Sequence, residues 1–188
     1  KILLETTRVD GILQEYKGTV IGDLYIGIIP TISPYLMPYL ISNISKMYPG
    51  IRLHVKELLT EEILSNLAKD QLDLGILSTP LHMDGIVETP LFFEKFLVYM
   101  NPEHVAFHKS AISAYDLLED KLWLLSEGNC FRNQSIHLCS LGDQDLQQSS
   151  FDYESGSLET LMRIVDMEGG ATIIPEWASL DASAEKRA

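Results

Sequence analysis

The chain contains 188 residues, of which 46% are hydrophobic and 22% are charged, a composition that excludes extensive disorder and collagen-like repeats. No apolar run reaches the roughly 18 residues of a membrane span, and two cysteines are too few for a disulfide scaffold. Because 27 acidic residues outnumber 14 basic ones and give a net charge of -13, the general field of the chain repels phosphate and excludes nonspecific binding to DNA or RNA.

The first residues show a helical pattern of apolar side chains. Residues 1–16 carry them at intervals of about three or four, which is typical of the tail of a longer helix. A signal peptide is not expected, because Glu5 and Asp10 interrupt any continuous apolar core. We therefore expect a cytoplasmic protein with no membrane partner.

The next sixty residues alternate between strand and helix patterns. The expected elements are strands at 23–29, 51–55 and 72–77, separated by helices that begin near 33 and 60. Ser33 can cap the first helix, Pro34 suits its first turn, and the pair Pro49 and Gly50 stops it. This repeat of strand and helix is typical of a parallel sheet.

After Pro80 this rhythm changes. The second half is predicted to contain apolar segments at 86–93 and 96–100, a short helix at 114–118, strands at 122–125, 151–153 and 171–174, and a helix at 158–167. Ser157 is a natural cap for the last helix, and Gly169 with Gly170 is a natural stop. The pattern favours an α/β fold with largely parallel sheets and a crossover into a second lobe, which leaves a cleft between the lobes.

Two threonines stand where ligands of parallel α/β sheets bind. Thr31 and Thr60 directly follow predicted strands, at the positions where helices begin. Their hydroxyls and the neighbouring backbone N–H groups suit a small oxygen-rich or anionic ligand. Threonine is also common as a turn or cap residue, so both interpretations stay open at this point.

Both cysteines fall within one segment, residues 126–141 (SEGNCFRNQSIHLCSL). The spacing of Cys130 and Cys139 matches neither a structural zinc site, which needs close ligand pairs, nor the C-x-x-C of a dithiol oxidoreductase. In one continuous helix their Cα atoms would lie about 13 Å apart along the axis, beyond the ~7 Å that a disulfide tolerates. A disulfide would then require the segment to refold and would act as a conformational switch.

The surroundings of Cys130 favour a thiolate. Gly128 before it and Arg132 after it indicate a turn into a helix, where N-terminal N–H groups and a guanidinium stabilise negative charge. Peroxides oxidise a thiolate to a sulfenic acid, which a second thiol, here Cys139, converts to a disulfide. Two inert buried cysteines are the alternative that the spacing leaves open.

Five residues of this segment form one pattern: Gly128, Cys130, Arg132, Gln134 and Cys139. Other short stretches accompany it in order, namely IPT at 29–31, PYL at 34–36 with Pro38, SLETL at 157–161 and IIP at 173–175. From about Gly22 to Pro175 they resemble the regulatory domain of LysR-type transcriptional regulators. The cysteine loop resembles that of the peroxide-sensing OxyR group, whereas ordinary members of the wider family lack it.

The resemblance implies a bilobed α/β fold like that of the type 2 periplasmic binding proteins. Lobe I would occupy about 19–80 and lobe II about 90–175, together forming a regulatory domain at 19–188. Residues 1–18 would be the remnant of a linker helix. The N-terminal helix-turn-helix domain and the full return of the chain to lobe I would lie outside this sequence.

The resemblance also implies a sensor rather than an enzyme, with no cofactor and no metal. Cys130 would be the peroxide-reactive thiol and Cys139 its disulfide partner. The implied peroxide-binding residues are Thr31, Thr60, Asn129 and Arg132. Oxidation would refold the loop and shift the interface of a homodimer or homotetramer. The absent domains would then bind DNA differently and control oxidative-stress genes, until cytosolic thiol reductants reverse the change.

One position departs from the family pattern, since Asn129 stands where many OxyR proteins have histidine directly before the reactive cysteine. An amide must therefore replace the imidazole there.

Three other interpretations stay open beside the sensor. His104 and His108 have the i, i+4 spacing of a metal site on a helix, although Pro102 lies beside them and no third ligand is evident. A thiol peroxidase would use Cys130 and Cys139 with turnover. A LysR-type effector-binding domain would sense a metabolite, and its cysteines would be incidental.

Overall fold

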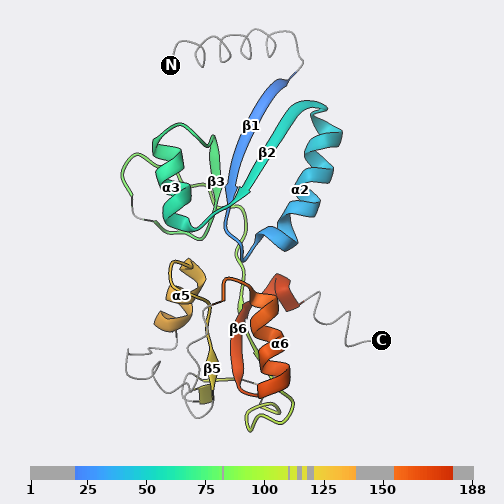
Figure 1. Cartoon of the computed structure of the whole chain (residues 1–188), viewed down its shortest axis with the longest axis vertical. Helices are drawn as coiled ribbons and strands as arrows, with labels where there is room; N and C mark the ends of the chain where they lie inside the picture. The colour runs from blue at the N-terminus through green and yellow to red at the C-terminus, as the bar shows by residue number, and fades with distance from the viewer. Residues whose placement is uncertain are drawn as a thin grey trace. The chain divides into compact units, whose positions relative to one another are not determined.

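The computed structural model of the chain describes residues 20–81, 83–109, 111–113, 116–117, 121–138 and 155–179. The chain divides into two compact units, one ending at Leu77 and the other beginning at Ser78 (Figure 1). The predictions for residues 1–18, for the strand at 151–153 and for Cys139 fall outside the described residues, as does most of the predicted helix at 114–118.

The first unit repeats strand and helix as the sequence predicts. Its elements are β1 (Ile21–Ile28), α2 (Ser33–Met47), β2 (Gly50–Glu57), α3 (Thr60–Ala68) and β3 (Leu74–Ile76). The three strands form one parallel sheet in the order β2-β1-β3. The carboxyl ends of all three strands therefore lie at the same edge of the sheet.

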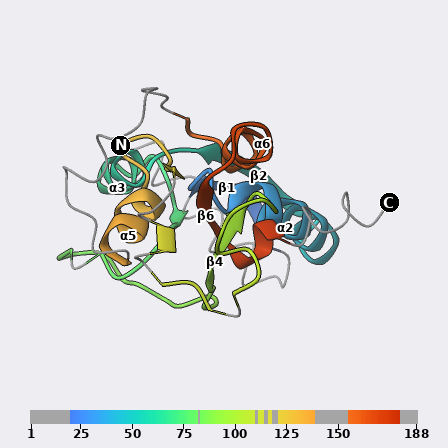
Figure 2. The same ribbon diagram turned by 90° about the horizontal axis from the view of Figure 1, so that it is seen from below.

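The two helices of this unit cover opposite faces of its sheet (Figures 1 and 2). On one face, Ile26 of β1 packs in the core with Met37 of α2. On the other face, a Cβ atom added at Gly27 would lie 2.7 Å from Cδ1 of Leu72 and 3.1 Å from Cγ1 of Ile63. The absence of a side chain at Gly27 thus lets α3 pack close to the sheet. The start of α3 then lies beside the ends of the strands.

The predicted cap at Ser33 is wrong. The helix α2 begins at Ser33, and Ile32 occupies the N-cap position without a side-chain hydrogen bond. The carbonyl of Ile29 accepts hydrogen bonds from the N–H groups of Ile32 and Ser33, both at 3.2 Å. Because the turn is closed by backbone, the Ser33 hydroxyl is left to donate to Oε1 of Glu57, 2.6 Å away at the end of β2. Pro34 does lie in the first turn, as predicted.

The second unit contains β4 (Phe96–Met100), β5 (Leu122–Trp123), α5 (Cys130–Leu138), α6 (Leu158–Glu168) and β6 (Ala171–Pro175). Its sheet has the order β4-β6-β5, in which β4 runs antiparallel and β5 parallel to β6. The prediction of largely parallel sheets is therefore wrong for this unit. All five residues of the central strand β6 are buried, and α5 and α6 lie on opposite sides of it (Figures 1 and 2).

Both ends of α6 follow the predicted signals. The Ser157 hydroxyl accepts a hydrogen bond from the N–H of Thr160 at 3.3 Å. The helix ends at Glu168, its C-cap residue Gly169 has φ +77°, and Gly170 follows with φ +84°. A Cβ atom at Gly170 would lie 2.3 Å from the carbonyl oxygen of Lys121, so only glycine fits there. None of the described helices is long and apolar enough to span a membrane.

Candidate functional site

The predicted turn before Cys130 is present. Gly128 has φ +84°, and α5 begins two residues later at Cys130. Asn129 closes the turn, because its Nδ2 donates to the carbonyl of Ser126 at 3.0 Å and to the hydroxyl of the same residue at 3.2 Å. Only 5% of Asn129 is exposed. Its amide N–H groups therefore hold the loop that places the cysteine.

Cys130 is a free, partly buried thiol at the first position of α5. The first N–H groups of a helix have no intrahelical acceptors, and the helix dipole adds partial positive charge at this end. The N–H of Asn133 is the first to reach back, at 3.4 Å from the carbonyl of Asn129. The thiolate that the sequence predicts at Cys130 stays a prediction, made from this position at the start of a helix.

Arg132 bonds to the backbone, and its expected roles beside the thiolate and toward peroxide stay predictions. One guanidinium nitrogen donates to the carbonyl of Leu125 at 3.3 Å. Within the described residues this group is bonded to backbone and to no sulfur atom. Arg132 thereby ties α5 to the segment that follows β5, which orients the helix that carries the thiol.

Two further side chains fasten α5 to its surroundings and a third bonds within the helix, and the sequence indicates none of these roles. The Phe131 ring is buried and stacks on Phe96 of β4, with ring centroids 4.9 Å apart. Nε2 of Gln134 donates to the hydroxyl of Ser78 at 2.5 Å. The Ser135 hydroxyl donates to the carbonyl of Phe131 at 2.8 Å. At the other end of the helix, 59% of Leu138 is exposed.

The length of α5 separates its two ends. Eight residue steps from Cys130 to Leu138 place their Cα atoms about 12 Å apart along the helix axis. A disulfide between Cys130 and the residue after Leu138 needs Cα atoms within about 7 Å, and one peptide unit adds 3.8 Å. The Cα atom of Leu138 would thus have to lie within about 11 Å of Cys130. The intact helix holds it farther away than this.

The two threonines follow adjacent strands at the same sheet edge of the first unit. Thr31 is buried in the turn between β1 and α2, and Thr60 is the first residue of α3. The N-cap position belongs to Leu59, whose N–H donates to Oε2 of Glu62 at 3.0 Å. Thr60 is therefore not the cap of α3.

The hydroxyl of Thr60 has an exceptional environment. Its Oγ1 is buried and has no hydrogen-bond partner among the described residues. Buried hydroxyls are nearly always bonded, because leaving one unpaired is unfavourable. This hydroxyl is available to a small ligand that can exchange a hydrogen bond with it.

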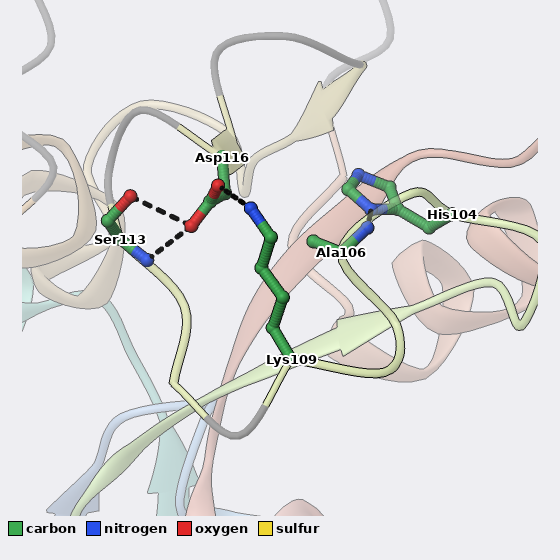
Figure 3. Close-up of polar contacts among 5 residues, drawn as sticks. All are labelled: His104, Ala106, Lys109, Ser113 and Asp116. Atoms are coloured by element: carbon green, nitrogen blue, oxygen red, sulfur yellow. Dashed lines mark hydrogen bonds and ion pairs between the residues drawn. The ribbon is translucent and has the colours of Figure 1, made fainter.

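The metal interpretation of the two histidines is not supported. Residues 101–109 form turns rather than the helix that would put His104 and His108 on one face. His104 is 6% exposed, and its Nδ1 accepts the N–H of Ala106 at 3.0 Å (Figure 3). His108 lies edge-on to Phe107, with ring centroids 5.4 Å apart. In the part of the chain that the structure describes, no group of three or more His, Cys, Asp or Glu side chains is placed to hold a metal.

A polar cluster follows these turns (Figure 3). The Asp116 carboxylate binds the ammonium of Lys109 and accepts hydrogen bonds from the N–H and the hydroxyl of Ser113, both at 2.8 Å. The Lys109 contact first, and then the Ser113 donors, hold the pKa of Asp116 well below its usual range. The N–H of Asp116 donates in turn to the carbonyl of Ser113 at 3.1 Å. The bond from the Ser113 N–H to the carboxylate is thus one half of a capping box, and the half in which the serine hydroxyl accepts is replaced by this backbone bond.

Comparisons with known proteins agree on one family. The model of the LysR substrate binding domain matches residues 17–188. A "Hydrogen peroxide-inducible genes activator" of Haemophilus influenzae is 30% identical over 165 residues, which are 88% of this chain and 54% of that protein. The chain therefore spans about half the length of this curated relative.

Two solved structures are similar in fold. OxyR from Porphyromonas gingivalis has a TM-score of 0.76 and 32% identity, covering 85% of this chain and 72% of that one. A hydrogen-peroxide-bound cysteine-to-serine mutant of OxyR from Corynebacterium glutamicum has a TM-score of 0.80 and 26% identity, covering 93% of this chain and 54% of that one.

Proposed function

The chain belongs to the LysR substrate-binding domain family, and from this premise we propose that it is the hydrogen-peroxide-sensing regulatory domain of a LysR-type transcriptional regulator. The family resemblance and the α/β fold class inferred from the sequence are confirmed. Relatives and structural neighbours named as peroxide-inducible activators or OxyR support the proposed stimulus. The observation that carries the proposal is the free thiol of Cys130 at the first position of α5.

The proposed chemistry has two steps. The Cys130 thiolate attacks one peroxide oxygen, the O–O bond breaks, and a sulfenic acid and hydroxide form. The Cys139 thiol then attacks the sulfenic sulfur, so that an S–S bond forms and the hydroxyl leaves as water after taking up a proton. In total, two thiols and one peroxide give one disulfide and two waters. Cellular thiol reductants reverse the oxidation by exchange.

Refolding of α5 links this chemistry to a signal. Cys139 follows the last residue of α5 in the chain, and the intact helix keeps Leu138 too far from Cys130 for the bond to close. Disulfide formation in this proposal therefore unwinds at least the last turn of α5. A domain without the bond and a domain with it would then present different surfaces to a partner subunit.

The proposal assigns two kinds of site residue. Thr31 and Thr60 would bind peroxide, a role supported by the buried and unpartnered hydroxyl of Thr60. Asn129 and Arg132, which the resemblance implies as peroxide ligands, have hydrogen bonds that favour a positioning role for the loop and for α5.

The remaining organisation is carried over from the resemblance as part of the same proposal. Residues 1–18 would belong to a linker helix, and a helix-turn-helix domain elsewhere in the full regulator would bind DNA. This division agrees with the net charge of -13, because the acidic chain itself repels phosphate. A homodimer or homotetramer in the cytoplasm would carry the signal, and the chain would act as a sensor without catalytic turnover.

The proposed function is tested by counting thiols in the reduced chain before and after one equivalent of hydrogen peroxide. Wild type should lose both thiols and two mass units, whereas Cys130→Ser should keep its remaining thiol. Cys139→Ser should stop at a sulfenic acid that a dimedone-type reagent traps. Two surviving thiols in wild type would refute the proposal and favour a metabolite-binding domain. Continuous peroxide consumption with reductant, at many turnovers per second, would instead favour a thiol peroxidase.

A further inference from the structure

We propose that the stacked rings of Phe96 and Phe131 set the equilibrium between the dithiol and the disulfide by holding α5 in its helical form. The inference rests on the proposed function, because it concerns the same disulfide. It assigns to these two phenylalanines a positioning role, since neither would react with peroxide.

The stack joins a fixed element to the element that must refold. Phe96 begins β4, which pairs with β6 from Phe96 opposite Pro175 to Met100 opposite Ala171. Phe131 is the second residue of α5 and directly follows the reactive cysteine. The two rings lie 4.9 Å apart with an interplanar angle of 28°, a stacked geometry that stabilises aromatic pairs. The Phe131 ring therefore anchors α5 to the sheet.

Among the described residues of α5, Phe131 is the one buried apolar side chain. Within the described part of α5, the buried residues are Phe131 and Ser135. The hydroxyl of Ser135 donates its hydrogen bond to the carbonyl of Phe131, within the helix. A helix of nine residues is too short to persist in water without tertiary contacts, since isolated helices below about 12–15 residues are marginal. The packing of this ring therefore adds to the hydrogen bonds of Arg132 and Gln134 in holding α5 in its helical form.

Unwinding for the disulfide acts on the same contact. Loss of the last turn would leave about five residues, and the hydrogen bonds of so short a remnant cannot hold it. If the remnant unfolds, the Phe131 ring loses its contact with Phe96. If the ring contact persists, it opposes the unwinding of α5. In either case the contact favours the dithiol form, and its removal should favour the disulfide.

The equilibrium is measurable in glutathione buffers. One protein dithiol and one oxidised glutathione give one protein disulfide and two reduced glutathiones, so electrons and protons balance. Phe96→Ala should raise this equilibrium constant by about three- to tenfold, and a tenfold change corresponds to about 30 mV in reduction potential. Phe93→Ala is the matched control, because it removes the same ring three residues away, where 95% of the side chain is exposed. It should change the constant less than twofold.

Two more variants separate the ring stack from general damage to the fold. Phe96→Tyr keeps the ring and should stay within twofold of wild type, while Phe96→Leu keeps apolar bulk without the ring and should shift in the direction of Phe96→Ala. Hydrogen exchange of the α5 amides, measured in a Cys130→Ser background, should be three- to tenfold faster with Phe96→Ala and unchanged with Phe93→Ala. This second readout needs no disulfide.

Each result decides the inference. Equal constants for Phe96→Ala and Phe93→Ala, in a chain whose wild type forms the disulfide, would overturn the role of the stack and leave the proposed function standing. A shift in Phe96→Tyr as large as that in Phe96→Ala would overturn it as well. Absence of any disulfide in wild type would overturn the proposed function and the inference together. If Phe96→Ala does not fold, Phe96→Leu and the exchange rates decide in its place.

Discussion

Thr60→Val should stabilise the fold and slow the oxidation of Cys130. Valine has nearly the shape of threonine but no hydroxyl, and Oγ1 of Thr60 is buried without a partner among the described residues. An unsatisfied buried hydroxyl is unfavourable by about 1–3 kcal/mol on the scale of protein mutations. Its removal should therefore raise the free energy of unfolding by about 1 kcal/mol, because local relaxation offsets part of the penalty.

The effect on the reaction has the opposite sign. In the proposed function this hydroxyl hydrogen-bonds to peroxide, and one neutral hydrogen bond contributes about 0.5–1.5 kcal/mol. Because about 1.4 kcal/mol is a factor of ten, the rate of thiol loss under limiting peroxide should fall about two- to tenfold.

Two assays on the same preparations check both signs. Urea unfolding gives the stability, and quenched-flow thiol counting gives the rate constant. Thr60→Ser keeps the hydroxyl and should retain the wild-type rate. A Thr60→Val chain that unfolds more easily than wild type would show that the hydroxyl has a structural partner. An unchanged rate would exclude Thr60 from the peroxide site.

Two further changes test the supports of the site and of the second unit. Asn129→Ala should lower the free energy of unfolding by about 1 kcal/mol, because the partly buried acceptors on Ser126 lose their donor. Asn129→Asp cannot donate while ionised and should not restore the stability, and wild-type stability of that variant in urea would refute the donor assignment. Asp116→Asn should lower Tm at pH 7. Contacts with Lys109 and Ser113 depress the pKa of the folded Asp116 carboxyl. The ionised carboxylate therefore stabilises the fold at any pH above its unfolded pKa of about 3.9. That contribution declines as the pH falls below the unfolded value and is lost as the pH passes the depressed folded pKa, so the difference in Tm from wild type should be smaller at pH 3 than at pH 7. A difference that grows on acidification would contradict the assignment.

Features set by near neighbours in the chain were predicted correctly. The start and end of α6 depend on Ser157 and Gly169, which lie next to the helix that they bound. The start of α5 likewise follows from the positive φ of Gly128. Such signals need no knowledge of the rest of the fold, because the interacting groups are three or four residues apart.

Features that depend on distant partners were missed. Ser33 resembles a cap in sequence, yet its hydroxyl binds Glu57, which is 24 positions away. The stack of Phe96 on Phe131 joins residues of different elements that no periodicity relates. The antiparallel direction of β4 is also a property of the assembled sheet. That Leu59 and not Thr60 occupies the N-cap position of α3 is likewise a property of the folded turn.

Hydrogen exchange of the α5 amides, followed as the chain is oxidised by one equivalent of peroxide, tests most directly whether the thiol chemistry is coupled to refolding. The amides of residues 134–138 should be protected in the reduced chain, and they should lose protection at the rate at which the disulfide forms. Cys139→Ser should be oxidised at Cys130 and keep its protection. Disulfide formation with undiminished protection of α5 would contradict the account, because the bond would then have closed without unwinding the helix.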